Sequence, residues 1–273
     1  MKSLLVHLDA SPCSAVRLAL AHRIARDHGA ALTALYAVMP SLITPYAASE
    51  GAWALASGFE ELDRELRGRA RALYEREAAT GPITWAELGS DPFATTMLEH
   101  ALLTDLLVLG QADPEDAQTG ALPVGFVPTL INDSGKPALI VPRVGSYERV
   151  GDEILVAWKA SPEAAHAVSA ALPLLRRARR VHLACAAPQG VAGRAGGNAL
   201  EFWLRLQGVT APVTMHSTVD DAPGEGLLSL AADTSADLLV MGCYGHGRAR
   251  EWVLGGATRT VLQSMTLPVL MAH

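Results

Sequence analysis

The chain has little of several things that define other classes of protein. Aromatic residues make up only 5% of its 273 residues. No uninterrupted apolar run approaches the roughly 18 residues of a membrane-spanning helix. Three cysteines, an odd number in a long chain, do not indicate a disulfide framework. The first residues reach Asp9 and Pro12 before any long apolar core, which disfavours a signal peptide. We therefore expect a cytoplasmic protein with aliphatic cores and no membrane partner.

Signals for nucleic-acid binding, metal binding and covalent catalysis are also missing. The net charge is −6, and basic residues gather only at positions 176–180, which disfavours nucleic acid as a partner. The nine histidines show neither an HExxH pattern nor Cys/His ligand spacing, so no metal site is expected. No Ser-His-Asp spacing or nucleophile elbow is visible. We predict no catalytic residue.

What the chain does contain is an internal repeat of about half its length. SLLVHLDASP near the start returns as EILVAWKASP from Glu153, and TDLLVLG and KPALIVPR return as ADLLVMG and LPVLMAH in the same order. Such self-similarity is the signature of a duplicated structural unit. We predict two domains, residues 1–146 and 147–273, with the polar segment 142–152 as linker.

Each repeat has strand patterns alternating with helix patterns, which predicts an α/β fold with a parallel sheet and right-handed crossovers. The predicted strands are Ser3–Leu8, Ala31–Val38, Thr84–Leu88, Leu106–Leu109, Ala138–Val141, Glu153–Ala157, Arg180–Cys185, Val213–Ser217, Leu238–Met241 and Val269–Met271. A long helical pattern over Phe59–Ala79 occurs only in the first repeat. Ser11 and Ser161 are expected as helix N-caps, with Pro12 and Pro162 at the first helical position.

The stretch GCYGHGRAREWVLGG, residues 242–256, directly follows a predicted buried strand. In an open parallel sheet, ligands bind at the carboxyl ends of the strands, where the strand order reverses. Glycines let a phosphate approach backbone N–H groups, and a helix start after Gly255 and Gly256 favours an anion. On these residues alone, a phosphate-binding loop and a plain glycine-rich connector both stay open. Asp105 and Asp237 begin their strands, so we expect them at the opposite edge of the sheet.

The spacing Gly242-x2-Gly245-x9-Gly255 resembles the signature of the nucleotide-binding universal stress protein family, and the likeness extends over the chain in two tandem copies. The resemblance implies an adenine-nucleotide alpha-hydrolase-like fold, with two open parallel five-stranded sheets of strand order 3-2-1-4-5 flanked by helices. It implies ATP or another adenine nucleotide as ligand, with Mg²⁺ accompanying it. It also implies that the final strands of the two halves pair as an intrachain pseudo-dimer, with a homodimer as a further assembly.

Carried onto this sequence, the resemblance places the nucleotide site in the second repeat. The predicted binding residues are Gly242, Gly245, His246, Gly247, Gly255, Gly256, Ala257, Thr258, Lys159 and Ala160. Two of them depart from the family pattern. Gly256 stands where the signature has Ser or Thr, so a hydroxyl donor is lost. Lys159 stands where the family has Asp, and an ammonium cannot accept a hydrogen bond from a ribose.

The first repeat departs in the opposite way. It keeps the acid, Asp9, but its loop lacks the second glycine and carries Asp113, Glu115 and Asp116, which repel phosphate. We therefore expect a stress-response binding or regulatory module, rather than an efficient enzyme, with nucleotide in the second repeat only. The alternatives are a slow nucleotide hydrolase that uses the same loop, and a ligand-free scaffold that acts through protein contacts.

Overall fold

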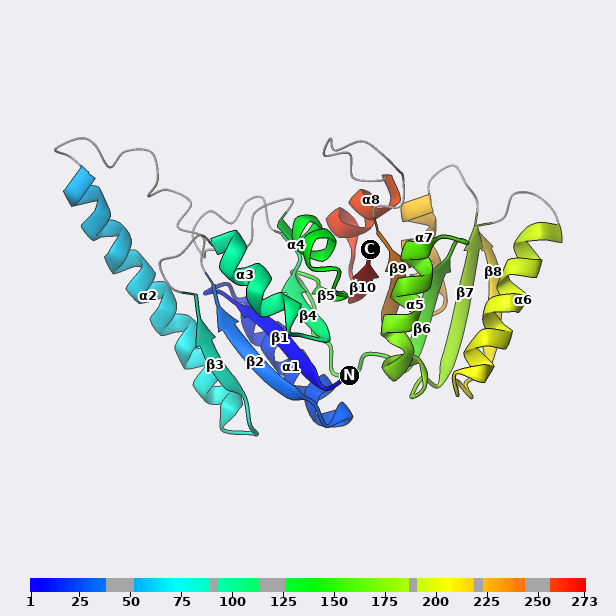
Figure 1. Ribbon diagram of the computed structural model, residues 1–273, viewed down its shortest axis with the longest axis horizontal. Helices are drawn as coiled ribbons and strands as arrows, with labels where there is room; N and C mark the ends of the chain where they lie inside the picture. The colour runs from blue at the N-terminus through cyan, green and yellow to red at the C-terminus, as the bar shows by residue number, and fades with distance from the viewer. Residues whose placement is uncertain (38–51, 89–92, 113–125, 187–190, 219–222, 244–255) are drawn as a thin grey trace. The chain divides into compact units, whose positions relative to one another are not determined.

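The computed structural model describes residues 1–37, 52–88, 93–112, 126–186, 191–218, 223–243 and 256–273 (Figure 1). The contacts within the chain define two compact units, Met1–Ser134 and Gly135–His273. The domain division expected from the repeat, after residue 146, stays a prediction.

The first unit is an α/β layer structure built on parallel strands. Its elements are β1 (Ser3–Leu8), α1 (Cys13–His28), β2 (Ala31–Tyr36), α2 (Ala52–Ala78), β3 (Thr84–Glu87), α3 (Phe93–Leu102), β4 (Leu106–Gly110) and α4 (Phe126–Ser134). The strand order is β3-β2-β1-β4, and every pair is parallel. The middle strands β1 and β4 are almost continuously buried and aliphatic, as expected when helices cover both faces of a parallel sheet.

The second unit repeats this plan with two additional strands, β5 before the repeat and β10 at its end. Its elements are β5 (Ala138–Val141), β6 (Glu153–Trp158), α5 (Pro162–Leu175), β7 (Arg180–Ala186), α6 (Val191–Leu206), β8 (Val213–Thr218), α7 (Pro223–Asp233), β9 (Leu238–Gly242), α8 (Gly256–Ser264) and β10 (Val269–Ala272). The strand order is β5-β10-β9-β6-β7-β8. Strands β8, β7, β6, β9 and β10 are parallel neighbours, which confirms the order 3-2-1-4-5 for the second repeat.

The final strands of the two repeats pair with each other, as the resemblance implies. Strand β5 runs antiparallel to β10, with Ile140 opposite Val269 and Ala138 opposite Met271. The ten strands therefore form one sheet rather than two separate ones. Within it each repeat keeps the expected strand order, β3-β2-β1-β4-β5 in the first and β8-β7-β6-β9-β10 in the second.

Two sequence predictions about the helices need correction. Ser11 does not cap α1: the helix begins at Cys13 without a side-chain cap, and the Ser11 N–H donates to the Asp9 carboxylate instead. The long helix α2 begins at Ala52, seven residues before the predicted Phe59. Ser161 does cap α5, where its Oγ accepts from the Ala164 N–H and Pro162 follows at the first helical position.

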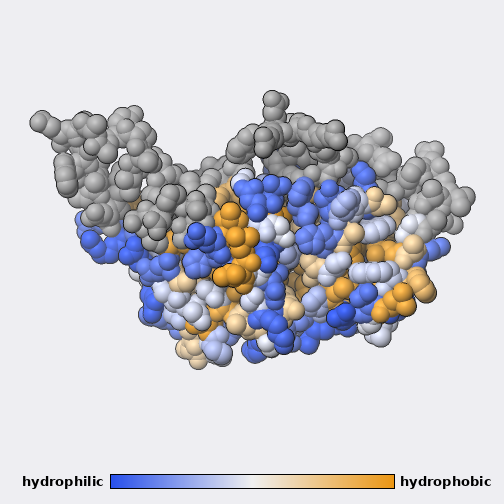
Figure 2. Space-filling view, viewed as in Figure 1, coloured by the Kyte–Doolittle hydropathy of each residue, from blue (hydrophilic) through white to orange (hydrophobic). Residues whose placement is uncertain are grey.

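The outer helix of the second unit has an apolar outer surface. Figure 2 shows hydrophobic surface over α6, and this helix exposes Phe202 and Leu206, one turn apart. Its inner surface packs on the sheet, where a Cβ added at Gly197 would touch the sulfur atoms of Cys185 and Met215. Single exposed apolar residues are common on protein surfaces, and nothing in the structure indicates what would cover these two.

Candidate functional site

The candidate site of the second unit lies where β6 and β9 end side by side. The two strands are parallel neighbours with Ala157 in register with Met241. Both end at the carboxyl edge of the sheet, β6 at Trp158, directly before Lys159, and β9 at Gly242. Strand β6 has β7 on its other side, so the strand order reverses here. This is the position at which open α/β sheets bind ligands.

The loop after β6 presents a cation at this edge. Lys159 and Ala160 are exposed, and the Lys159 carbonyl accepts a hydrogen bond from the Ser161 N–H at 2.7 Å. Helix α5 starts immediately afterwards at Pro162. The turn thus places the Lys159 side chain in solvent at the switch point.

Gly242 is glycine because a helix lies against it. A Cβ added there would lie 2.6 Å from both the Ala164 nitrogen and the Glu163 carbonyl carbon, which are backbone atoms of α5. Its φ is not in the left-handed region. Glycine is therefore not needed here for a left-handed backbone angle. The residue permits α5 to approach the end of β9 closely.

The start of α8 supplies a second part of the site. Gly256 is the first residue of this helix and is exposed, and a Cβ added to it would meet nothing within 4 Å. Ala257 is half-buried, and Thr258 is buried in the packing below. The free N–H groups of a helix start, together with the helix dipole, favour an anion. The other predicted loop residues, Gly245, His246, Gly247 and Gly255, lie outside the described residues.

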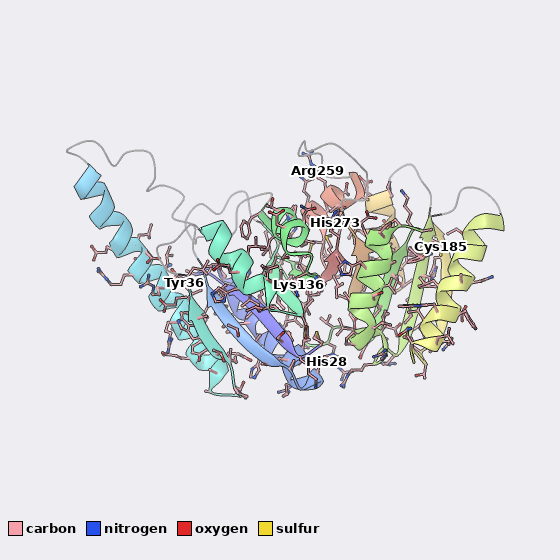
Figure 3. All side chains as sticks on the ribbon, viewed as in Figure 1. His28, Tyr36, Lys136, Cys185, Arg259 and His273 are labelled. Carbon is pink, nitrogen blue, oxygen red and sulfur yellow. The ribbon has the colours of Figure 1, made fainter. Side chains whose placement is uncertain are left out.

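One residue near this helix start was missed by the sequence argument. Arg259 lies in the first turn of α8 and is exposed (Figure 3). Its position three residues after Gly256 places a second cation beside the helix start. The signal was in the sequence, because the residues that follow the third glycine of the loop form one helical turn.

A polar cluster lies beside Gly242, beneath the start of α5. The Cys243 N–H donates to the Ala272 carbonyl at 2.9 Å, and the Cys243 carbonyl oxygen lies 3.1 Å from His273 Nδ1. Figure 3 shows His273 at the end of β10. Burial and the nearby Glu163 charge raise the pKa of the Cys243 thiol to about 12. This thiol is therefore protonated at neutral pH, which disfavours the redox chemistry that depends on a thiolate.

Comparison with known proteins identifies this half of the chain. The model of the universal stress protein family matches residues 152–273. Residues 152–273 are thus similar to the universal stress protein family. The matched segment includes β6 to β10 and every residue of the candidate site.

Solved structures extend the likeness to the whole chain at the level of fold. A universal stress protein from Archaeoglobus fulgidus DSM 4304 superposes with a TM-score of 0.65 at 16% identity, covering 99% of this chain and 97% of that chain. A putative universal stress protein from Pseudomonas aeruginosa UCBPP-PA14 gives 0.62 at 17% identity, with 100% and 93% coverage. Among curated proteins, universal stress protein Slr1230 of Synechocystis is 41% identical over 46 residues, which span 17% of this chain and 16% of that relative.

In the first unit, the position that corresponds to the candidate site of the second unit is occupied by the protein's own side chains. Asp9, at the end of β1, is only 2% exposed. Its Oδ2 accepts from Arg17 Nη2 at 2.9 Å, and its Oδ1 accepts from Ser14 Oγ at 2.7 Å and from the Ser11 N–H at 2.8 Å. A Cβ added at Gly110, the end of β4, would collide with Arg17 Nη1. The guanidinium therefore fills the space between the ends of β1 and β4.

The electrostatics of this buried group keep Asp9 ionised. Burial alone raises the pKa of Asp9, but the charge of Arg17, the proximity of His7 and the hydrogen bonds from Ser11 and Ser14 outweigh it and hold that pKa well below its ordinary value. Burial lowers the pKa of His7 to about 4, so its imidazole is neutral at pH 7. The Nε2–H of this neutral ring donates to the Ala37 carbonyl at 2.7 Å. Asp9 is thus committed to Arg17 and is not available to a nucleoside.

The acids that begin the fourth strands have structural roles at the other edge. Asp105 Oδ2 accepts from the backbone N–H groups of Lys2 and Ser3, and Asp237 accepts from those of Gly151 and Asp152. The prediction that both lie away from the ligand edge is confirmed. Among the described residues, no group of three or more His, Cys, Asp or Glu side chains is arranged to hold a metal ion. No helix in the described ranges is long and apolar enough to cross a membrane.

Proposed function

We propose that the second repeat binds ATP or another adenine nucleotide at the carboxyl edge of β6 and β9, and that the chain acts as a stress-response binding or regulatory module. One contrast carries the proposal. At the same edge, the first repeat is filled by Arg17 bound to Asp9, whereas the second leaves Lys159, Ala160 and the helix start at Gly256 exposed. The family of residues 152–273 supports the same ligand class.

The chemistry of the exposed groups suits a phosphate chain. Helix α8 begins at Gly256, and the first turn of a helix presents N–H groups that need partners from outside the helix, together with the positive end of the helix dipole. Lys159 and Arg259 add two cations, and a basic side chain pairs with phosphate oxygens as a charged donor. The absence of a side chain at Gly256 leaves the helix start open to close approach. The contributions of Gly245, His246, Gly247 and Gly255 remain predictions.

We propose that Mg²⁺ enters with the nucleotide rather than on ligands of the protein. Mg²⁺ takes oxygen ligands, keeps several waters and is commonly bound through substrate phosphates. The described residues offer no ready-made cluster of acids at this edge. Binding of ATP should then tighten with Mg²⁺, while Mg²⁺ alone binds weakly.

Equilibrium binding of labelled ATP to the full chain tests the proposal. We expect one site per chain. Lys159→Gln should weaken binding about tenfold, since a hydrogen bond to a charged group is worth about 1.5–3 kcal/mol. Lys2→Gln is the matched control, because Lys2 is also exposed but lies at the start of β1, at the amino edge. Two equivalent sites, or none, would contradict the proposal.

Two other outcomes would favour the alternative functions. Steady phosphate release above the buffer background that stops in a Gly245→Asp variant would indicate the slow nucleotide hydrolase. Denatured protein that releases no nucleotide, combined with no thermal shift in millimolar ATP, would indicate the scaffold. A homodimer is a separate proposal, tested by the mass of the purified chain in solution.

A further inference from the structure

We propose that Glu163 supplies the carboxylate that recognises the ribose of the bound nucleotide, in place of the acid that the second repeat lacks at Lys159. This inference rests on the proposed nucleotide-binding function and specifies how the site reads the nucleoside. Glu163 lies in the first turn of α5, four residues after Lys159, the position at which the family has its acid.

The need for such a group follows from the chemistry of Lys159. A ribose presents two hydroxyl groups that act as donors, and a carboxylate accepts from both, whereas an ammonium has donors only. Lys159 therefore suits the phosphates and leaves the ribose hydroxyls without an acceptor. Another carboxylate at this edge would fill that role.

The backbone brings Glu163 to the required position. A Cβ added at Gly242 would lie 2.9 Å from Glu163 Cβ, so the side chain leaves α5 directly over the end of β9. The charges of His273 and Lys159 act on Glu163 and lower its pKa, and the charge of Glu163 in turn raises the pKa of the Cys243 thiol. Its carboxylate thus belongs to the same edge of the sheet as the exposed cation and the first glycine of the loop.

One oxygen of this carboxylate lacks a donor. Glu163 Oε2 is buried, and no described group donates a hydrogen bond to it. Buried polar atoms in native proteins nearly always have a partner, so an unpaired one calls for a ligand or water. The group is ionised at neutral pH, because a hydrogen bond with the Ser161 side chain, the backbone at the helix start and the nearby His273 and Lys159 hold the pKa of Glu163 below its ordinary value. An ionised oxygen without a donor is a strong acceptor for a hydroxyl.

The first repeat shows the reverse arrangement. The residue that corresponds to Glu163 is Cys13, and the residue that corresponds to Lys159 is Asp9. Each repeat therefore carries one acid near the start of its first helix, at different positions. In the first repeat, Arg17 donates a hydrogen bond to that acid, Asp9. In the second repeat the residue that corresponds to Arg17 is Ala167, which has no side-chain donor for Glu163.

The test compares ATP, 2′-deoxy-ATP and tripolyphosphate on the full chain and three variants. Glu163→Ala should weaken ATP at least tenfold and leave tripolyphosphate equal or tighter, because the lost group contacts the nucleoside and carries negative charge. Glu163→Gln keeps the shape and should weaken ATP severalfold, which guards against misfolding of the alanine variant. Asp233→Asn is the matched control, because Asp233 is an exposed acid in the same unit at the last residue of α7, the end away from the α8 start, and it should change nothing.

Comparing ATP with 2′-deoxy-ATP distinguishes failure of the ribose contact from failure of nucleotide binding itself. The wild type should prefer ATP to 2′-deoxy-ATP, and this preference should disappear in Glu163→Ala. If the wild type binds ATP but Glu163→Ala binds it within twofold, or keeps the preference, the inference is overturned while nucleotide binding stands. If the wild type binds neither ATP nor tripolyphosphate, the proposed function fails and this inference fails with it.

Discussion

The two repeats have the same carboxyl edge of a parallel sheet but place different side chains there, a buried charged group in the first and alanines with an exposed lysine in the second. In the first, His7, Asp9, Ser14 and Arg17 form a buried hydrogen-bonded group. In the second, the same positions are Ala157, Lys159, Ala164 and Ala167.

The difference shows how a duplicated fold can fill this edge with its own side chains in one repeat and leave it exposed in the other. Alanine side chains let α5 lie against the end of β9, where it touches Gly242. Arginine instead extends across the end of the sheet to an acid, with its Nε donating to the His7 carbonyl at 2.8 Å. The first edge then gains stability from its own side chains, and the second stays open at the same place.

The largest effect is expected from removing Arg17. Arg17→Ala leaves Asp9 charged and unpaired in the core, and breaking one side of a buried pair costs about 3–5 kcal/mol. The free energy of unfolding of the first unit, followed by hydrogen exchange of the β1 amides, should fall by that amount. Arg26→Ala on the same helix is the control, because its pair with Asp27 is exposed, and it should cost less than about 0.5 kcal/mol.

A double variant then sharpens the comparison. Asp9→Ala combined with Arg17→Ala removes both charges, so it should recover part of the loss, as replacing a whole buried pair is far milder than halving it. If Arg17→Ala alone lowers the free energy of unfolding by less than about 1 kcal/mol, the Arg17–Asp9 pair does not fill and stabilise this edge as inferred.

The next effect concerns the glycines at the two ends of the loop. Gly242→Ala forces a methyl group against the backbone of Glu163 and Ala164, and such overpacking costs about 1–3 kcal/mol. Gly256→Ala meets no atom and replaces a helical glycine, so it should be neutral or stabilise by up to about 1 kcal/mol. Urea unfolding of both variants measures the difference, and equal costs would mean that Gly242 is not held by α5.

A smaller effect is expected from restoring the hydroxyl that the loop lacks. Gly256→Ser fits without a clash and adds a donor at the α8 start, so ATP should bind about tenfold more tightly, or roughly 1.4 kcal/mol. Gly256→Ala keeps the backbone and lacks the hydroxyl, which makes it the control. Equal affinities for the two variants would show that this position does not contact phosphate.

Most of the fold could be read from the sequence, because strands in parallel sheets are short aliphatic runs that the repeat shows twice. The strand Ser3–Leu8 was predicted with its observed bounds, and the predicted Leu238–Met241 lacks only Gly242. The sequence could not show that Arg17 closes the first edge, since one arginine in a helical pattern is normally exposed. Nor could it show that Glu163 lies over the end of β9, which depends on how closely α5 approaches Gly242.

The smallest effect lies in the longest helix, α2 with 27 residues, whose counterpart in the second repeat, α6, has only 16. Helix α2 carries exposed ion pairs between residues one turn apart, among them Arg69 with Glu65. It also makes a second kind of contact, in which Arg71 lies over the Trp85 ring, 4.9 Å from the ring centroid.

Exposed ion pairs at this spacing are worth about 0.3–0.5 kcal/mol. Glu65→Gln should therefore lower the free energy of unfolding by that much in low salt. In 1 M salt, where the Debye length is about 3 Å, it should have almost no effect. Arg71→Ala should cost more and keep most of its effect in salt, because it also removes packing against the ring. Urea unfolding at both salt concentrations measures the four values. A Glu65→Gln loss as large as that of Arg71→Ala would mean that surface charge, rather than stacking on the edge strand β3, holds α2 in place.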